Sequence, residues 1–107
     1  MQIHREITTA QWGSYSLAFQ LGTIGAEVSR LLSWLKKGDQ DQSEKALFRA
    51  LELLDETIIQ SLQKENLGEL LRLRELLCSR VFAPETYQVT DKQLEQYFLP
   101  FAILARK

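Results

Sequence analysis

The sequence contains very few residues of the types that bind metals or form disulfide bonds. Among its 107 residues it has one cysteine and one histidine. The lone Cys78 cannot form a disulfide bond within the chain, which is typical of proteins in a reducing compartment. A di-iron site in a helical bundle needs Glu-x-x-His pairs, and His4 precedes the first predicted helix. We therefore expect no metal, no cofactor and no catalytic role for Cys78, because the core segments contain no histidine to act as its general base.

Long apolar segments, runs of one charge and a leader peptide are also missing. The most apolar stretch, residues 10–35, is interrupted by Gln20, Glu27 and Arg30, whereas a membrane helix needs about 20 predominantly apolar residues. The 13 basic and 14 acidic residues are interspersed, without the basic stripe of a nucleic-acid-binding protein. The N-terminus has no charged-then-apolar leader. We therefore expect a soluble cytoplasmic protein without a membrane or nucleic-acid partner.

What the sequence does contain is the composition and periodicity of a small helical domain. Hydrophobic residues make up 45% of the chain and charged residues 25%, so a folded core is expected. A chain of this length forms one domain, residues 1–107. Apolar residues recur at helical spacing, and no convincing strand pattern occurs. The periodicity predicts helices over about residues 9–36, 39–63, 66–80 and from 90 onward.

Capping and terminating residues support these boundaries. Gly38 follows Lys36 and Lys37, which is the order expected where a helix ends. Asp39 or Asp41 then begins the next helix. Three pairs have capping-box spacing at the starts of the later helices: Asp41 with Glu44, Asn66 with Glu69, and Thr90 with Gln93.

The connections between the helices are short enough to define the architecture. About three, three and nine residues separate consecutive helices, and short loops make neighbouring helices antiparallel. We therefore predict an all-α fold, an up-down-up-down four-helix bundle. Pro100 falls inside the last helix, where it removes a backbone hydrogen bond. This helix either kinks at Pro100, the alternative we favour, or is split there into two helices.

The first predicted helix is apolar on more sides than one bundle can bury. Its core seam runs from Leu17 to Leu35 in steps of three and four residues. Beside the seam lies a stripe of small residues. Each glycine inside the helix lowers the stability of the helix by about 1 kcal/mol relative to alanine. Aromatic residues lie roughly opposite the seam. We therefore predict an interface with a second copy about a two-fold axis, or with another protein, formed by Trp12, Phe19, Gly22, Gly25, Ala26 and Trp34. The alternative is that the tryptophans fold over segments of their own chain and that the glycines are merely tolerated.

Arg74 lies in the middle of a leucine-rich face of the third predicted helix. A guanidinium buried there requires a carboxylate partner, because an unpaired buried charge is very costly. Glu27 and Asp55 lie at the edges of apolar stripes and are the candidate partners. Three interpretations are open: an internal ion pair that fixes helix register, an arginine that binds an anionic ligand between helices, and a side chain that reaches solvent at the bundle edge.

The segment RLRELLCSRVFAPETY, residues 72–87, resembles part of the small helical HEPN-type bundles. In that family an arginine is followed four to six residues later by a histidine and then by a tyrosine. Arg74 matches the arginine, Cys78 or Arg80 stands in place of the histidine, and Tyr87 is displaced into a loop. Because the histidine is missing, the resemblance implies a non-catalytic bundle that pairs with a partner, and it does not imply ribonuclease activity.

These patterns lead to two hypotheses about function. The first is a non-enzymatic protein that acts by protein–protein association through its first helix. The alternative is a nucleotide- or phosphate-binding or hydrolytic bundle. In that case Arg74 binds the anion, and carboxylates hold a metal ion; the candidates are Glu27, Asp55 and Glu52.

Overall fold

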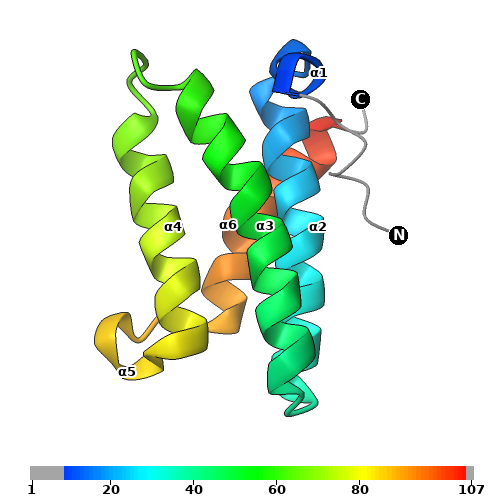
Figure 1. The fold of residues 1–107 in the computed structure, drawn as a ribbon, viewed down its shortest axis with the longest axis vertical. Helices are drawn as coiled ribbons and strands as arrows, with labels where there is room; N and C mark the ends of the chain where they lie inside the picture. Colours follow the sequence, from blue (N-terminus) through cyan, green and yellow to red (C-terminus); the bar gives the residue numbers. More distant parts are fainter. Residues whose placement is uncertain (1–8, 106–107) are drawn as a thin grey trace.

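The computed structural model describes residues 9–105, and every regular element in this range is a helix. The four long helices alternate in direction, so the predicted all-α up-down-up-down bundle is confirmed (Figure 1). A short helix precedes the first long helix, and another lies between the third and the fourth. The elements are α1 (Thr9–Ser14), α2 (Leu17–Lys36), α3 (Gln40–Gln60), α4 (Leu67–Phe82), α5 (Pro84–Tyr87) and α6 (Asp91–Ala105).

The second helix is the centre of the packing. It lies against α3 on one side and against α6 on another, whereas α4 packs against α3 (Figure 1). The core contains side chains from each long helix, among them Ile24, Leu54, Leu77 and Phe98. Burial of these apolar surfaces is the main favourable term in folding. Helix α2 thus contacts both α3, the next helix along the chain, and α6, the last helix of the described residues.

The first predicted helix is in fact two helices, which corrects the predicted span of 9–36. Helix α1 ends at Ser14, and Ser16 adopts an extended conformation and caps α2. Its side-chain oxygen accepts a hydrogen bond from Phe19 N at 3.1 Å. On the other side of the break, the Gln20 side chain donates to the backbone oxygen of Trp12 at 2.9 Å. These bonds satisfy backbone groups that a continuous helix would pair internally.

Several predicted helix ends are confirmed. Gly38 has a φ of 74°, a left-handed conformation that glycine adopts without strain. Asp39 begins α3, and its carboxylate accepts from Gln42 N at 3.0 Å. Thr90 and Gln93 form a reciprocal capping box at α6, with N···O distances of 2.8 and 3.1 Å.

One expected helix cap is missing, and of the two alternatives at Pro100 the one we did not favour, a split helix, is wrong. Asn66 precedes α4 without a side-chain capping bond, and the Glu69 side chain, which would complete the capping box, accepts a hydrogen bond from Tyr97 instead. Helix α6 continues through Pro100, so the last helix is not split there. Beyond α4, the helix α5 occupies part of what we expected to be loop.

Candidate functional site

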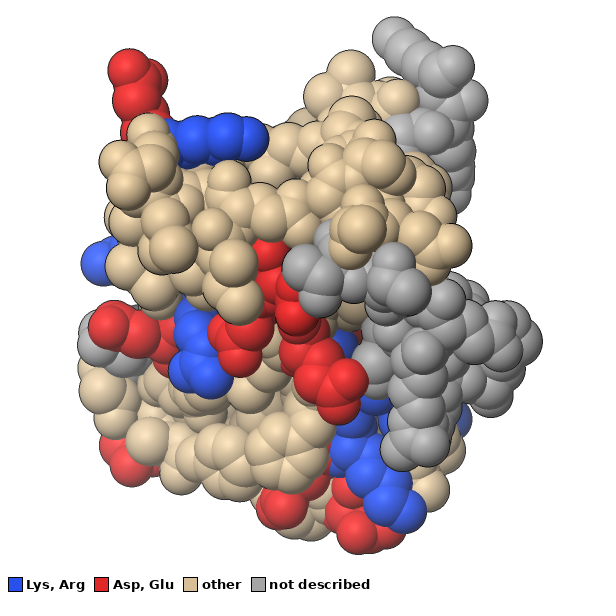
Figure 2. All heavy atoms as spheres, turned by 45° about the horizontal axis from the view of Figure 1, so that its top comes forward, with Lys and Arg blue, Asp and Glu red and all other residues tan. Residues whose placement is uncertain are grey.

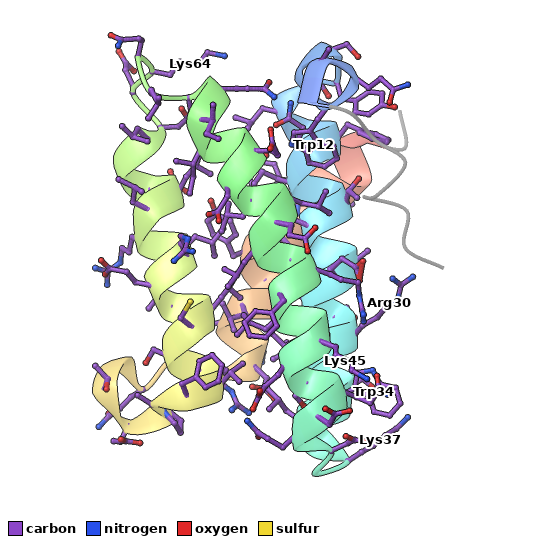
Figure 3. All side chains as sticks on the ribbon, viewed as in Figure 1. Trp12, Arg30, Trp34, Lys37, Lys45 and Lys64 are labelled. Carbon is purple, nitrogen blue, oxygen red and sulfur yellow. The ribbon has the colours of Figure 1, made fainter. Side chains whose placement is uncertain are left out.

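Trp12 is buried, which corrects its assignment to an interface. Its side chain is 1% exposed, and Figure 3 shows it pointing inward at one end of the bundle. The indole N–H donates to Thr57 Oγ1 at 2.9 Å, and this hydroxyl donates to Gln20 Oε1 at 2.9 Å. The break before α2 turns α1 out of line with α2, so Trp12 reaches the core. Trp12 therefore packs α1 against the bundle of its own chain.

The small residues of α2 face α6 of the same chain. A Cβ atom added at Gly25 would lie 2.8 Å from Phe98 Cβ and 3.0 Å from Phe98 Cγ. No real Cβ approaches a neighbour so closely without displacing it. The absence of a side chain at Gly25 is therefore explained by the close approach of α6, without a second chain.

Next to this contact, a groove runs between α2 and α6. It has a volume of about 630 Å³, and Gly22 and Ala26 lie along it. Phe19 and Leu99 stand at its sides with 39% and 57% of their surface exposed. We call this feature the α2–α6 groove; the residues that line it are Phe19, Gly22, Thr23, Gly25, Ala26, Val28, Ser29, Glu95, Phe98 and Leu99.

Trp34 lies away from the α2–α6 groove. It is 15 residues beyond Phe19, which corresponds to about 22 Å along a helix. Its ring is partly buried against the core, and Lys37 Nζ lies 4.8 Å from the ring centroid (Figure 3). A cation over an indole face is a favourable surface contact. The predicted interface residues thus divide into the buried Trp12, the groove residues and a separate Trp34.

Arg74 forms an ion pair with Asp55, one of its two candidate partners. Arg74 Nε lies 2.8 Å from Asp55 Oδ1, and Nη2 lies 3.4 Å from Oδ2. The pair joins α4 to α3, but its side chains are 42% and 46% exposed, so it lies at the edge of the bundle. The hydrogen bond from Arg74 to Asp55 raises the pKa of the guanidinium. The arginine that carries the resemblance to HEPN-type bundles is thus engaged by a carboxylate.

Glu27, the other candidate partner, lies elsewhere and is more deeply buried. Its side chain is 8% exposed, and Arg30 Nη1 donates to its Oε1 at 2.9 Å. Arg49 Nε from α3 lies 3.7 Å from the same oxygen. The carboxylate therefore faces two guanidinium groups, that of Arg30 on its own helix and that of Arg49 across the α2–α3 contact. The structure does not bring Arg74, Glu27 and Asp55 together into one site.

The different burial of the two carboxylates leads to a testable difference in stability. We expect Asp55→Asn to lower the free energy of unfolding by less than about 1 kcal/mol, as for other exposed ion pairs. Glu27→Gln should cost about 1–3 kcal/mol, because it leaves charged donors facing a buried neutral amide. Urea denaturation of both variants measures the two losses. Equal losses would contradict the distinction between them.

A second groove lies between α4 and α6. Its volume is about 430 Å³. Tyr97 Oη donates to Glu69 Oε1 across it at 2.8 Å. Burial, together with this bond to a carboxylate, raises the pKa of the Tyr97 phenol. We call this feature the α4–α6 groove; it is lined by Glu69, Arg72, Leu73, Leu76, Gln88, Val89, Gln93, Leu94 and Tyr97.

Charged and metal-binding residues are dispersed. Within residues 9–105, no three histidine, cysteine, aspartate or glutamate side chains are grouped so that they could hold a metal ion; His4 lies outside this range. On the face shown in Figure 2, Lys and Arg atoms occur in separate groups among Asp and Glu atoms. Among the helices described, none is long and apolar enough to span a bilayer.

In comparisons with known proteins, no family model, curated protein or solved structure matches this chain.

Proposed function

We propose that this chain functions by associating with a second copy of itself through the α2–α6 groove. The observation that carries the proposal is that exposed apolar side chains and an apolar groove occupy the same face. Phe19 and Leu99 project beside a groove floored in part by Gly22 and Ala26. Exposed apolar surface next to a concave site is typical of protein-binding faces.

Symmetry favours a second copy as the occupant. In a two-fold dimer the same patch on both chains must fit itself, so each projection needs a matching recess on that patch. Here the projections and the recess are neighbours. Phe19 of each copy can enter the groove of the other beside Ala26, which is exposed. A large aromatic side chain seated in a pocket is the usual anchor of a stable interface.

Further exposed apolar residues extend this face. They lie around the start of α2 and toward the end of α6, and they would enlarge the buried area of a dimer. The additional exposed residues are Tyr15, whose ring centroid lies 4.7 Å from that of Phe19, and Ile103, which lies about one helical turn beyond Leu99 on α6.

The single half-buried Cys78 fits a reducing compartment, and we propose the cytoplasm as the setting.

The test is the solution mass of the protein, measured by light scattering after gel filtration at low micromolar concentration and about tenfold more dilute. We expect a dimer for the unaltered chain. Phe19→Ser and Leu99→Gln should shift the mass toward that of a monomer, because each removes an apolar group from the proposed interface.

The matched control is Phe48→Ser, since Phe48 is also an exposed aromatic residue but lies on α3 outside the groove. This variant should remain dimeric. Circular dichroism of the three variants confirms that each is folded. A monomer for the unaltered chain at both concentrations, or equal dissociation of the Phe48 variant, would contradict the proposal.

A further inference from the structure

We propose that the α4–α6 groove binds a small amphipathic organic anion, a molecule with an apolar body and one carboxylate or sulfonate group. This proposal is independent of self-association, because the groove shares no residue with the α2–α6 groove. Its volume of about 430 Å³ is within the usual range of small-molecule sites. Apolar walls with a few convergent polar groups are the typical lining of such sites.

The walls of the groove provide a surface for the apolar body of the ligand. Leu73 and Leu94 are almost fully buried and face each other from α4 and α6. Leu76 and Val89 are partly buried and continue this surface. Because Leu73 and Leu94 are already shielded from water, a ligand gains mainly by covering the exposed parts of Leu76 and Val89, and burial of this apolar area favours binding.

The polar groups that are still available around the groove are mainly donors. Gln93 Oε1 already accepts a hydrogen bond from Thr90 N at 2.8 Å, which leaves its Nε2 group to donate. Gln88 presents a second side-chain amide. Arg72 adds a guanidinium that forms no ion pair or hydrogen bond within the described part of the chain. Donors around one unpaired positive charge suit a ligand whose polar end accepts hydrogen bonds and is negative.

Among the residues that line the groove, Glu69 carries the opposing negative charge. Glu69 Oε1 accepts the Tyr97 hydroxyl proton at 2.8 Å, so this carboxylate is directed toward α6. Its charge still weakens the binding of an anion in the same groove. The charges of Arg72 and Glu69 therefore have opposite expected effects on affinity, which makes the proposal testable by the sign of each effect.

The experiment uses two dyes of similar shape as probes. One is 1-anilinonaphthalene-8-sulfonate, and the other is N-phenyl-1-naphthylamine, which lacks the sulfonate. We expect the sulfonate to bind the intact chain more tightly in a fluorescence titration. Backbone amide NMR shifts on binding should fall in α4 and α6 around the groove.

The variants separate the proposed contacts from general effects of charge. Arg72→Gln should weaken binding of the sulfonate about tenfold or more, whereas Glu69→Gln should tighten it. Lys92→Gln removes an exposed positive charge from α6 outside the groove and should leave the affinity unchanged. Phe19→Ser should also have no effect, because that residue lies in the other groove.

Any of four results would overturn the proposal. The first is absence of sulfonate binding to the intact chain, and the second is equal affinity for the charged and the neutral dye. The others are unchanged affinity in Arg72→Gln and NMR shifts confined to the α2–α6 groove. Because Arg72→Gln and Glu69→Gln keep every residue of the α2–α6 groove, a failure here is distinct from a failure of self-association.

Discussion

Replacement of Trp12 by alanine should lower the free energy of unfolding by about 3–5 kcal/mol, the usual cost of removing a large aromatic side chain from a core. The indole ring is 1% exposed, so its loss leaves a cavity between α1 and the bundle. It also removes the donor to Thr57, and Thr57 bonds to Gln20 on α2. Because small domains are stable by only about 5–15 kcal/mol, this one substitution affects a large part of the total. Urea denaturation followed by circular dichroism measures the loss.

Two further variants identify the origin of this effect. Trp12→Phe keeps an aromatic ring but removes the indole N–H, and it should cost about 1–3 kcal/mol because the buried Thr57 hydroxyl loses a donor. Trp34→Ala removes the other tryptophan, which is only partly buried, and should cost clearly less than Trp12→Ala. If the two alanine variants lose the same stability, the difference in burial between the tryptophans is contradicted.

Replacement of Gly25 by leucine should cost about 3 kcal/mol, the upper part of the usual range for overpacking a core. The added Cβ would lie 2.8 Å from Phe98 Cβ. That atom is attached directly to the backbone of α6, so it cannot rotate away as the tip of a long side chain can. Helix α6 must move outward, which separates the core side chains of Phe98 and its neighbours from α2. Thermal and urea denaturation measure the change in stability.

The control for this variant is Gly68→Leu. Gly68 also lies in a helix, but no heavy atom lies within 4 Å of a Cβ added there. Leucine has a higher helix propensity than glycine, so this variant should be unchanged or stabilised by up to about 1 kcal/mol. A destabilisation of similar size at both positions would indicate that close packing against Phe98 is not the cause.

The sequence predicted the long helices and their alternating directions because apolar periodicity and short connections are local properties. The break before α2 was missed because the predicted helix was extended back to residue 9 across Gly13, Ser14 and Ser16, although the regular apolar seam begins only at Leu17. The direction of the Trp12 side chain was then predicted as if Trp12 belonged to the same helix as the residues of α2. Because Trp12 lies in α1 instead, a residue of the core was assigned to the predicted interface. The signal that could have located the break was Ser16 at an N-cap position.

The partners of charged residues were less predictable than the helices. The sequence identified Glu27 and Asp55 as carboxylates at the edges of apolar stripes, and Asp55 does pair with Arg74. Glu27 instead faces Arg49, which sequence reasoning did not select. Which carboxylate meets which arginine depends on the rotation and the offset of packed helices, and these are set by the whole core. The glycine pattern likewise indicated a close approach at Gly25 but not that α6 makes it.

The contact between α2 and α6 also affects when the protein can fold during its synthesis. Helix α2 leaves the ribosome before α3 and α4, and α6 leaves it after them. Until then Gly25 and the apolar residues around it have no α6 to pack against, although α3 is already present. The core is therefore completed only once α6 has emerged, and until that point nascent chains carry an uncovered apolar face of the kind that favours aggregation and chaperone binding.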